Sequence, residues 1–116
     1  MSDDLDALAS NTISRSTMSQ TDVDQQLAAL GARWSIVGPD LVLTLAGPKG
    51  MAQAGAAVAY ATALADEMDH HPSIAMEYPA TTLKIHTHDK KAITLLDFVW
   101  AARLERWLRE HGWDQP

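Results

Sequence analysis

Hydrophobic positions along this chain change their spacing several times, and these changes mark helices and strands. Spacings of three and four residues predict helices over residues 19–31, 51–70 and 94–112. Alternating apolar positions, interrupted by Gly and Pro turn signals, predict two hairpins over residues 34–46 and 73–88. The predicted order of elements is therefore α-β-β-α-β-β-α.

This order indicates an α+β fold with two layers. Two hairpins separated by helices make a four-stranded antiparallel sheet with three helices on one face. Leu41, Leu43 and Leu45 share one face of a strand, because successive side chains alternate, and we expect that face to cover the core. Thr94 is the expected N-cap of the last helix, with Asp97 at its third position.

The N-terminal segment differs in composition from the rest of the chain. Residues 1–18 are rich in Ser, Thr, Asn and Asp, with Leu5, Leu8 and Ile13 as sparse apolar positions. Such a segment buries too little apolar surface to offset the entropy that it loses on ordering. We therefore expect residues 1–18 to form a disordered acidic tail and residues 19–116 to form a single domain.

Composition narrows the classes of function. The chain has 116 residues, a formal net charge of -6 and no cysteine. Net negative charge disfavours direct binding to nucleic acid or to an anionic membrane, and without cysteine any catalysis depends on other side chains. No apolar run reaches the roughly 20 residues that span a bilayer, and the acidic N-terminus is unlike a signal peptide. We expect a cytoplasmic protein that binds a small polar molecule.

Four of the five histidines lie close together in the sequence, at positions 70, 71, 86 and 88. Imidazole donates and accepts protons near neutral pH and is also a common zinc ligand, so the cluster indicates either acid–base catalysis or metal binding. His70 and His71 end a predicted helix, because Pro72 disfavours helical backbone at His71. His86 and His88 are two apart on a predicted strand and share a face. The residues alone leave both alternatives open.

Three further residues belong to the candidate site, and an ordinary structural role can explain two of them. Glu67 lies one helical turn before the histidine pair. Asp97 is the expected capping partner of Thr94, which accounts for it without any chemistry. Tyr78 closes a predicted strand, where a packed ring is the ordinary finding.

Together these residues resemble the pterin-4a-carbinolamine dehydratase family. The similarity lies in the pattern Glu67-x-x-His70-His71-Pro72, followed by Tyr78, Thr87-His88-Asp89 and Ile93-Thr94-x-x-Asp97. The order of the predicted helices and strands is similar to that of the family over residues 21–112. The resemblance implies the α+β fold described above, no cofactor and no metal, and assembly as a homodimer or homotetramer.

The resemblance also implies a pterin site built from His70, His71 and His88. Its substrate would be a 4a-hydroxytetrahydropterin, which loses water to give the quinonoid dihydropterin during recycling of a tetrahydrobiopterin-type cofactor. We expect the three rings to border one slot, with His70 as base, His88 as acid and His71 as an orienting partner; base and acid are interchangeable at this stage. The expected substrate-binding or supporting residues are Glu67, Asp69, Pro72, Tyr78, His86 and Asp97.

The chain departs from the family pattern at two places near these residues. Lys91-Ala92 stands where the family has a pair of glycines, and His86 is an added imidazole. These departures keep a second hypothesis open, in which a catalytically weak dehydratase-like protein binds a partner, acts as a dimerisation cofactor or assists assembly. Pterin turnover would favour the enzyme, whereas a co-purifying protein without turnover would favour the second hypothesis.

Overall fold

A single antiparallel sheet organises the computed structural model, which describes residues 2–46 and 50–113. The strands are β1 (Trp34–Val37), β2 (Asp40–Ala46), β3 (Ser73–Met76) and β4 (Ala80–Ile85). Their order across the sheet is β1-β2-β4-β3, and each neighbouring pair is antiparallel. The predicted four-stranded antiparallel sheet is confirmed.

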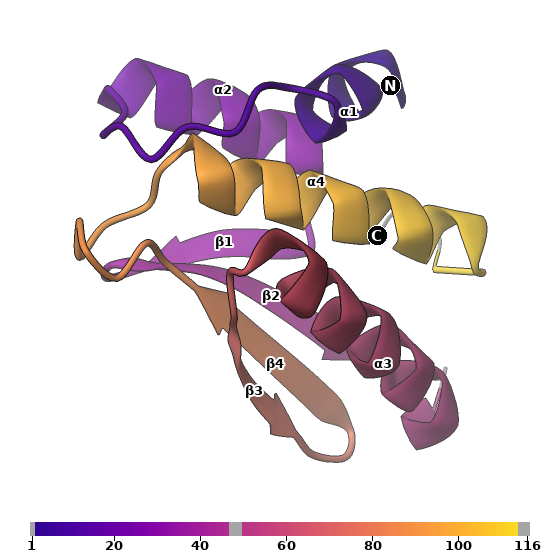
Figure 1. Cartoon of the computed structure of the whole chain (residues 1–116). Coiled ribbons are helices and arrows are strands. Elements are labelled where there is room, and N and C mark those ends of the chain that lie inside the picture. The colour runs from indigo at the N-terminus through magenta and orange to yellow at the C-terminus, as the bar shows by residue number, and fades with distance from the viewer. Residues whose placement is uncertain (1, 47–49, 114–116) are drawn as a thin grey trace.

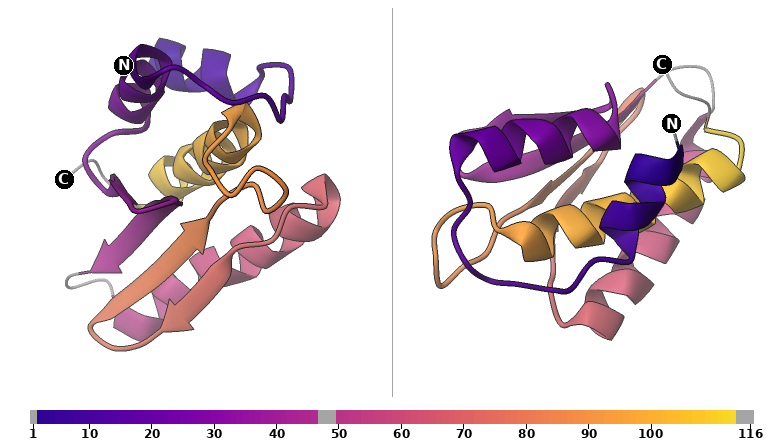
Figure 2. Two further views of the ribbon diagram at one scale, coloured as in Figure 1. Left: turned by 90° about the vertical axis from the view of Figure 1, so that its left-hand side faces the viewer. Right: turned by 90° about the horizontal axis from the view of Figure 1, so that it is seen from above.

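Four helices accompany the sheet in the described residues (Figure 1). The three predicted helices are present as α2 (Gln20–Leu30), α3 (Gly50–Met68) and α4 (Leu95–Glu110), and α1 (Ser2–Ala9) is additional. α3 and α4 lie across one face of the sheet, and α4 contacts all three other helices. Figure 2 shows α1 and α2 on the side of α4 that faces away from α3. None of the described helices is long and apolar enough to span a bilayer.

The core lies between the inner face of the sheet and α4. Leu41, Leu43 and Leu45 are at most 2% exposed, which confirms the predicted inward face of β2. Leu83 and Ile85 of β4 continue that face. α4 contributes a run of fully buried side chains, which includes Phe98, Val99, Trp100 and Leu104.

A buried carboxylate fixes α4 against β1. Glu105 is 1% exposed and accepts hydrogen bonds from Arg33 Nε at 2.9 Å, Trp34 Nε1 at 2.8 Å and Arg109 Nε at 2.7 Å. A carboxylate removed from water needs such donors, because its desolvation is otherwise unfavourable. The network holds the second half of α4 in place and so sets where its first turn lies.

Helix α1 differs from the disordered tail that the sequence analysis expected. Leu5 and Leu8 are 1% and 2% exposed and belong to the main core, because α1 packs on α4. Arg103 Nε of α4 also donates to the Ala9 carbonyl at 3.0 Å. Leu5 and Leu8 are three apart and share a helix face, and α4 supplies the apolar partner surface that the segment lacks by itself.

The segment that follows α1 runs along the start of α4. The Leu96 N–H donates to the Ser14 carbonyl at 2.9 Å, and Thr17 pairs with Thr94 in an isolated β-bridge. These backbone contacts join the N-terminal segment to the loop between β4 and α4. That loop carries several of the candidate site residues.

Candidate functional site

The end of α3 turns the first histidine inward. Asp69 has φ of 50°, its N–H donates to the Asp66 carbonyl at 3.3 Å, and the His70 N–H donates to the Ala65 carbonyl at 2.9 Å. These two bonds form a Schellman motif, which satisfies the last carbonyls of a helix and reverses the chain. After this reversal His70 is buried, at 5% exposed, while the neighbouring His71 faces solvent.

His70 contacts Asp97, the residue at the third position of α4. His70 Nε2 lies 2.5 Å from Asp97 Oδ1, and Asp97 is 0% exposed. The other oxygen, Oδ2, accepts from the Thr87 hydroxyl and from the Thr94 backbone N–H, each at 2.8 Å. Because a carboxylate only accepts, His70 presents Nε2–H to Asp97.

Asp97 takes part in the cap of α4 and also contacts a histidine. Thr94 is the N-cap of α4, as predicted, and Asp97 accepts the N–H of that cap. The same carboxylate also contacts an imidazole that is 27 residues away in the sequence. Helix capping orients the carboxylate, and its second oxygen remains available to the histidine.

Thr87 joins this network, although its place in the family pattern by itself indicates no role for its side chain. Its side chain is 0% exposed, and its oxygen lies 2.7 Å from Thr94 Oγ1. Since the Thr87 hydroxyl donates to Asp97, the Thr94 hydroxyl is the donor to Thr87. A signal for this role was present in the sequence. Every second residue from position 83 faces the core, namely Leu83, Ile85 and Thr87, and a hydroxyl in such an apolar series indicates a buried hydrogen bond.

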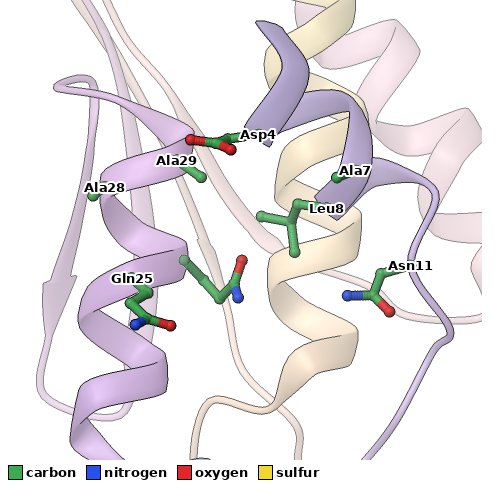
Figure 3. A pocket seen from close by; sticks show the side chains of 8 residues that line it. Asp4, Ala7, Leu8, Asn11, Gln25, Ala28 and Ala29 are labelled. Carbon is green, nitrogen blue, oxygen red and sulfur yellow. The ribbon is translucent and has the colours of Figure 1, made fainter. Parts of the chain in front are cut away.

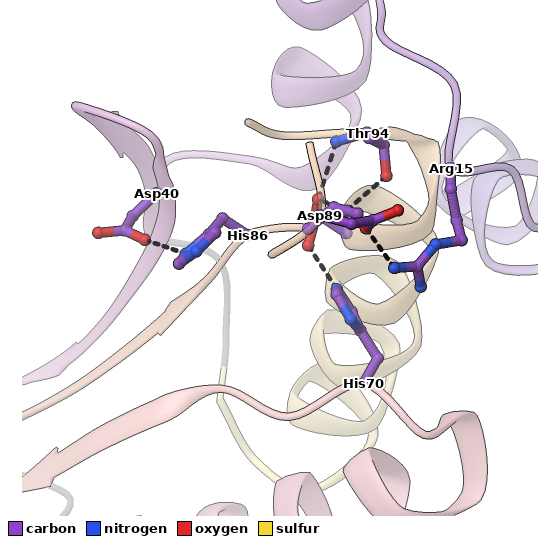
Figure 4. A network of polar contacts seen from close by, with 8 residues as sticks. Arg15, Asp40, His70, His86, Asp89 and Thr94 are labelled. Carbon is purple, nitrogen blue, oxygen red and sulfur yellow. Dashed lines mark hydrogen bonds and ion pairs between the residues drawn. The ribbon is translucent and has the colours of Figure 1, made fainter. Parts of the chain in front are cut away.

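The remaining histidines of the cluster lie on the outer side. β4 ends at Ile85, whereas the sequence predicted a strand that continues to residue 88. The side chains still alternate after Ile85, so that Thr87 is buried and His86 and His88 point outward. Their ring centroids are 4.4 Å apart with an interplanar angle of 67°. His86 Nδ1 lies 2.9 Å from Asp40 Oδ1 (Figure 4). These contacts join the end of β4 to the start of β2.

The two histidine pairs meet at one corner of the sheet. Ser73 and Lys84 form the last pair of the β3–β4 ladder, with His71 two residues before Ser73 and His86 two residues after Lys84. His71 Nε2 lies 3.1 Å from Asp66 Oδ1, and both of these side chains are exposed. A shallow hollow of about 170 Å³ opens beside this corner, lined by Ser73, Ile74, Ala75, Thr82 and Lys84.

We expected three imidazoles to border one slot, but one of the three lies on the other side of this corner from the other two. His71 and His88 are both exposed on the outer side of this corner. His70 lies on the inner side, where its Nε2 contacts the buried Asp97. The turn at the end of α3 explains the difference, because it buries His70 and leaves the next residue, His71, exposed.

The other predicted site residues divide by position. Glu67 and Asp69 are exposed at the end of α3, and Pro72 is half-buried beside them. Tyr78 is 72% exposed and lies at the far end of β4, before the cis peptide bond to Pro79. The six residues of β4 separate it from the histidines by about 20 Å. Within one chain, Tyr78 is thus outside the histidine corner.

A histidine cluster is also compatible with a metal site, which requires several ligand side chains in one place. Across residues 2–46 and 50–113, no group of three or more His, Cys, Asp and Glu side chains is arranged to hold a metal ion. The zinc alternative therefore has no ligand set in that part of the chain.

A larger hollow of about 470 Å³ lies between α1 and α2 (Figure 3). Among the residues that line this hollow, Asp4 is the one ionisable side chain, so the hollow offers no pair of groups for acid–base catalysis. Most of the residues that line this hollow belong to α1 and α2, and these helices lie on the side of α4 away from α3 (Figure 2). Its lining residues are Asp4, Ala7, Leu8, Asn11, Gln25, Gln26, Ala28 and Ala29.

Comparisons with known proteins identify relatives in sequence and in fold. Residues 16–107 match the family model described as pterin 4 alpha carbinolamine dehydratase. A protein of Chromobacterium violaceum is 33% identical over 98 residues, which are 82% of this chain and 86% of that protein. A protein of Streptomyces avermitilis is 31% identical over 96 residues, which are 82% of this chain and 93% of that protein. Both carry the name "Putative pterin-4-alpha-carbinolamine dehydratase".

A solved structure shares the fold. The transcriptional coactivator/pterin dehydratase from Brucella melitensis superposes with a TM-score of 0.70 at 22% identity, covering 78% of this chain and 97% of its own. The matched residues 16–107 include the helix-end pair His70 and His71, the loop residue His88 and the buried Asp97. The chain belongs to the pterin-4-alpha-carbinolamine dehydratase family.

Proposed function

We propose that this protein dehydrates a 4a-hydroxytetrahydropterin to the quinonoid dihydropterin and water, as a step in recycling a tetrahydrobiopterin-type cofactor. The reaction needs one group to protonate the departing hydroxyl and another to remove a proton from the neighbouring ring nitrogen. Two imidazoles suit these tasks near neutral pH. Family membership supports the reaction class, and the histidine corner supports the assignment of residues.

The Asp97 contacts are the observation that carries the proposal. One oxygen of Asp97 contacts His70, the neighbour of His71, and the other accepts from Thr87, the neighbour of His88. A single buried carboxylate thereby ties together the two backbone segments that carry the exposed imidazoles. Such a fixed spacing is what two groups acting on opposite parts of one flat ring require.

Burial supports a change in the expected roles of His70 and His71. A general acid or base must come within hydrogen-bond reach of its substrate. His70 is 5% exposed and its Nε2 is committed to Asp97, whereas His71 and His88 are exposed. We therefore assign proton exchange to His71 and His88, with His70 as a positioning residue.

The partner of His71 suggests which of the two is the base. Asp66 Oδ1 lies 3.1 Å from His71 Nε2, and a carboxylate there favours the tautomer with hydrogen on Nε2. His71 Nδ1 is then the nitrogen that accepts a proton from the substrate. His88 is left as the acid that protonates the departing hydroxyl.

A spectrophotometric assay of 4a-hydroxytetrahydropterin dehydration tests these roles. We expect His71→Ala and His88→Ala each to lower kcat by about 10²–10⁴, the usual contribution of a general acid or base. His111→Ala is the matched control, because His111 is an exposed imidazole at the C-cap of α4, outside the corner. Wild-type turnover in both His71→Ala and His88→Ala would reject the assignment.

The second hypothesis, a binding or assembly protein, has one observation in its favour. The Brucella melitensis protein of the same fold is described as a coactivator as well as a dehydratase. Absence of pterin turnover together with a stoichiometric protein partner would select this function instead. The expected homodimer or homotetramer stays a prediction, and light scattering coupled to size-exclusion chromatography of the purified chain tests it.

A further inference from the structure

We propose that Asp40 and His86 form a positioning pair that orients the ring of His88. The inference rests on the proposed function, because it concerns how His88 is held as the acid. His86 is the imidazole by which this chain differs from the family pattern. Neither Asp40 nor His86 is needed for the proton transfers themselves.

Strand pairing brings Asp40 to His86. Leu41 pairs with Ile85 in the β2–β4 ladder, so the next pair in the same register is Asp40 with His86. Asp40 also pairs with Val37 of β1, next to a turn in which Gly38 has φ of 60°. The carboxylate therefore belongs to a hairpin end that two neighbouring strands hold in place.

The contact between Asp40 and His86 sets the state of the His86 ring. Nδ1 of His86 lies 2.9 Å from Oδ1 of Asp40, and the two side chains are 27% and 24% exposed. Because the carboxylate is the acceptor, Nδ1 of His86 carries the hydrogen. The bond fixes both the tautomer and the plane of the ring, as carboxylate partners of histidine do in other sites.

The His86 ring in turn lies against His88. Their centroids are 4.4 Å apart and their planes meet at 67°, an edge-to-face arrangement. His88 follows β4 in a loop, and its side chain is exposed. An exposed side chain in a loop samples several rotamers, so a fixed ring beside it restricts where its nitrogens point.

The energetic role follows from the sensitivity of catalysis to geometry. Misplacing a reacting group by about 1 Å can lower the rate on the order of 10²-fold. Loosening one side of His88 is a smaller change than that, so we expect a loss of about 10-fold in kcat. KM should stay close to the wild-type value, because neither Asp40 nor His86 contacts the substrate in this scheme.

Three variants separate positioning from a general loss of structure. Asp40→Ala and His86→Ala remove the pair, whereas Asp40→Asn keeps an oxygen that can accept from His86 Nδ1 and should restore most of kcat. Asp24→Ala is the matched control, since Asp24 is an exposed aspartate of α2 whose hydrogen bond is to Gln20. Thermal melts of each variant show whether the fold is retained.

Nitrogen-15 NMR of the imidazole rings adds a readout that does not depend on turnover. In the wild type we expect His86 to show hydrogen on Nδ1, and Asp40→Ala should change that tautomer and alter the His88 ring signals. A His88 ring that is unaffected by Asp40→Ala would overturn the inference, whatever the activity.

The kinetic outcomes distinguish this inference from the proposed function. If the wild type turns over, His88→Ala is impaired, and Asp40→Ala and His86→Ala both match the wild type, positioning is rejected and the dehydratase assignment stands. If the wild type shows no turnover, the dehydratase assignment is rejected and this inference is rejected with it. A lower kcat in Asp40→Ala and His86→Ala with recovery in Asp40→Asn supports the pair.

Discussion

Nε2 of His70 lies 2.5 Å from Oδ1 of Asp97, and both side chains are buried although 27 residues separate them in the sequence. The carboxylate also accepts from Thr87 and Thr94, so one side chain joins the end of α3, the end of β4 and the start of α4. Stability and site geometry thus depend on the same group.

Replacing Asp97 should lower the free energy of unfolding. Asp97→Ala leaves three buried donors without their acceptor, on His70, Thr87 and the Thr94 backbone. Removing one partner of a buried pair typically costs about 3–5 kcal/mol. Urea denaturation at neutral pH measures the loss.

The control for Asp97 is the same substitution at an exposed partner of a histidine. Asp66→Ala removes the carboxylate beside His71, where both side chains are more than half exposed. Exposed pairs contribute about 0–1 kcal/mol, so Asp66→Ala should change stability little. Equal losses in the two variants would show that the Asp97 network is not a buried one in solution.

Helix α1 should contribute measurably to stability if it packs as described. Leu5 is 1% exposed within the main core, and Leu→Ala at buried positions costs about 2–5 kcal/mol. We expect Leu5→Ala to lower the free energy of unfolding within that range, measured by urea denaturation. Ile13→Ala, at a position 45% exposed, is the control that should have a small effect. A disordered tail would instead make both substitutions neutral.

Lys91 occupies a backbone conformation that suits glycine. Its φ is 50°, in the left-handed region, at the place where the family pattern has glycines. For a residue with a Cβ this conformation is unfavourable by about 1–2 kcal/mol. Glycine avoids that strain, but it loses more backbone entropy on folding, which destabilises the fold by about 0.5–1 kcal/mol. The difference predicts that Lys91→Gly stabilises the fold by about 0.5–1 kcal/mol.

The neighbouring lysine tests that explanation. Lys90 has no positive φ, so Lys90→Gly gains no relief of strain and should lower stability through backbone entropy alone. Opposite signs for the two substitutions in chemical denaturation are the expected result. A loss of stability in Lys91→Gly would mean that the strain at this position is negligible.

The N-terminal segment also contacts the residue after His88. The Arg15 guanidinium donates to Asp89 Oδ1, and this hydrogen bond lowers the pKa of the Asp89 carboxyl below its ordinary value. A carboxyl with a lower pKa in the folded state stabilises the fold above its unfolded pKa of about 3.9. That stabilisation is lost as the pH falls through the folded pKa.

Arg15→Gln should therefore raise the pKa of Asp89 toward its ordinary value, which carbon-13 NMR titration of the side-chain carboxyl measures. Arg106→Gln is the control, because Arg106 pairs with Asp6 at 3.6 Å and is not a partner of Asp89. Identical titration of Asp89 in the wild type and in Arg15→Gln would show that the segment after α1 does not hold this loop in solution.

Much of the fold could be predicted because its signals are local. The inward leucines of β2 and the Thr94 cap of α4 each depend on residues a few positions apart. The histidine pattern was likewise visible in the sequence and led to the family. Strand ends were less well predicted, since β4 stops at Ile85 and leaves His86 and His88 in a loop.

Periodicity and capping act between near neighbours, so the order of residues was enough to predict the element order, the inward face of the sheet and the residue types available for acid–base chemistry. Three features became visible only in the folded chain: α1 packs on α4, Asp97 holds His70 on the inner side, and strand register pairs Asp40 with His86 across 46 residues. A sequence pattern states which side chains are to be buried or paired, whereas the partner of each comes from segments that meet when the chain folds.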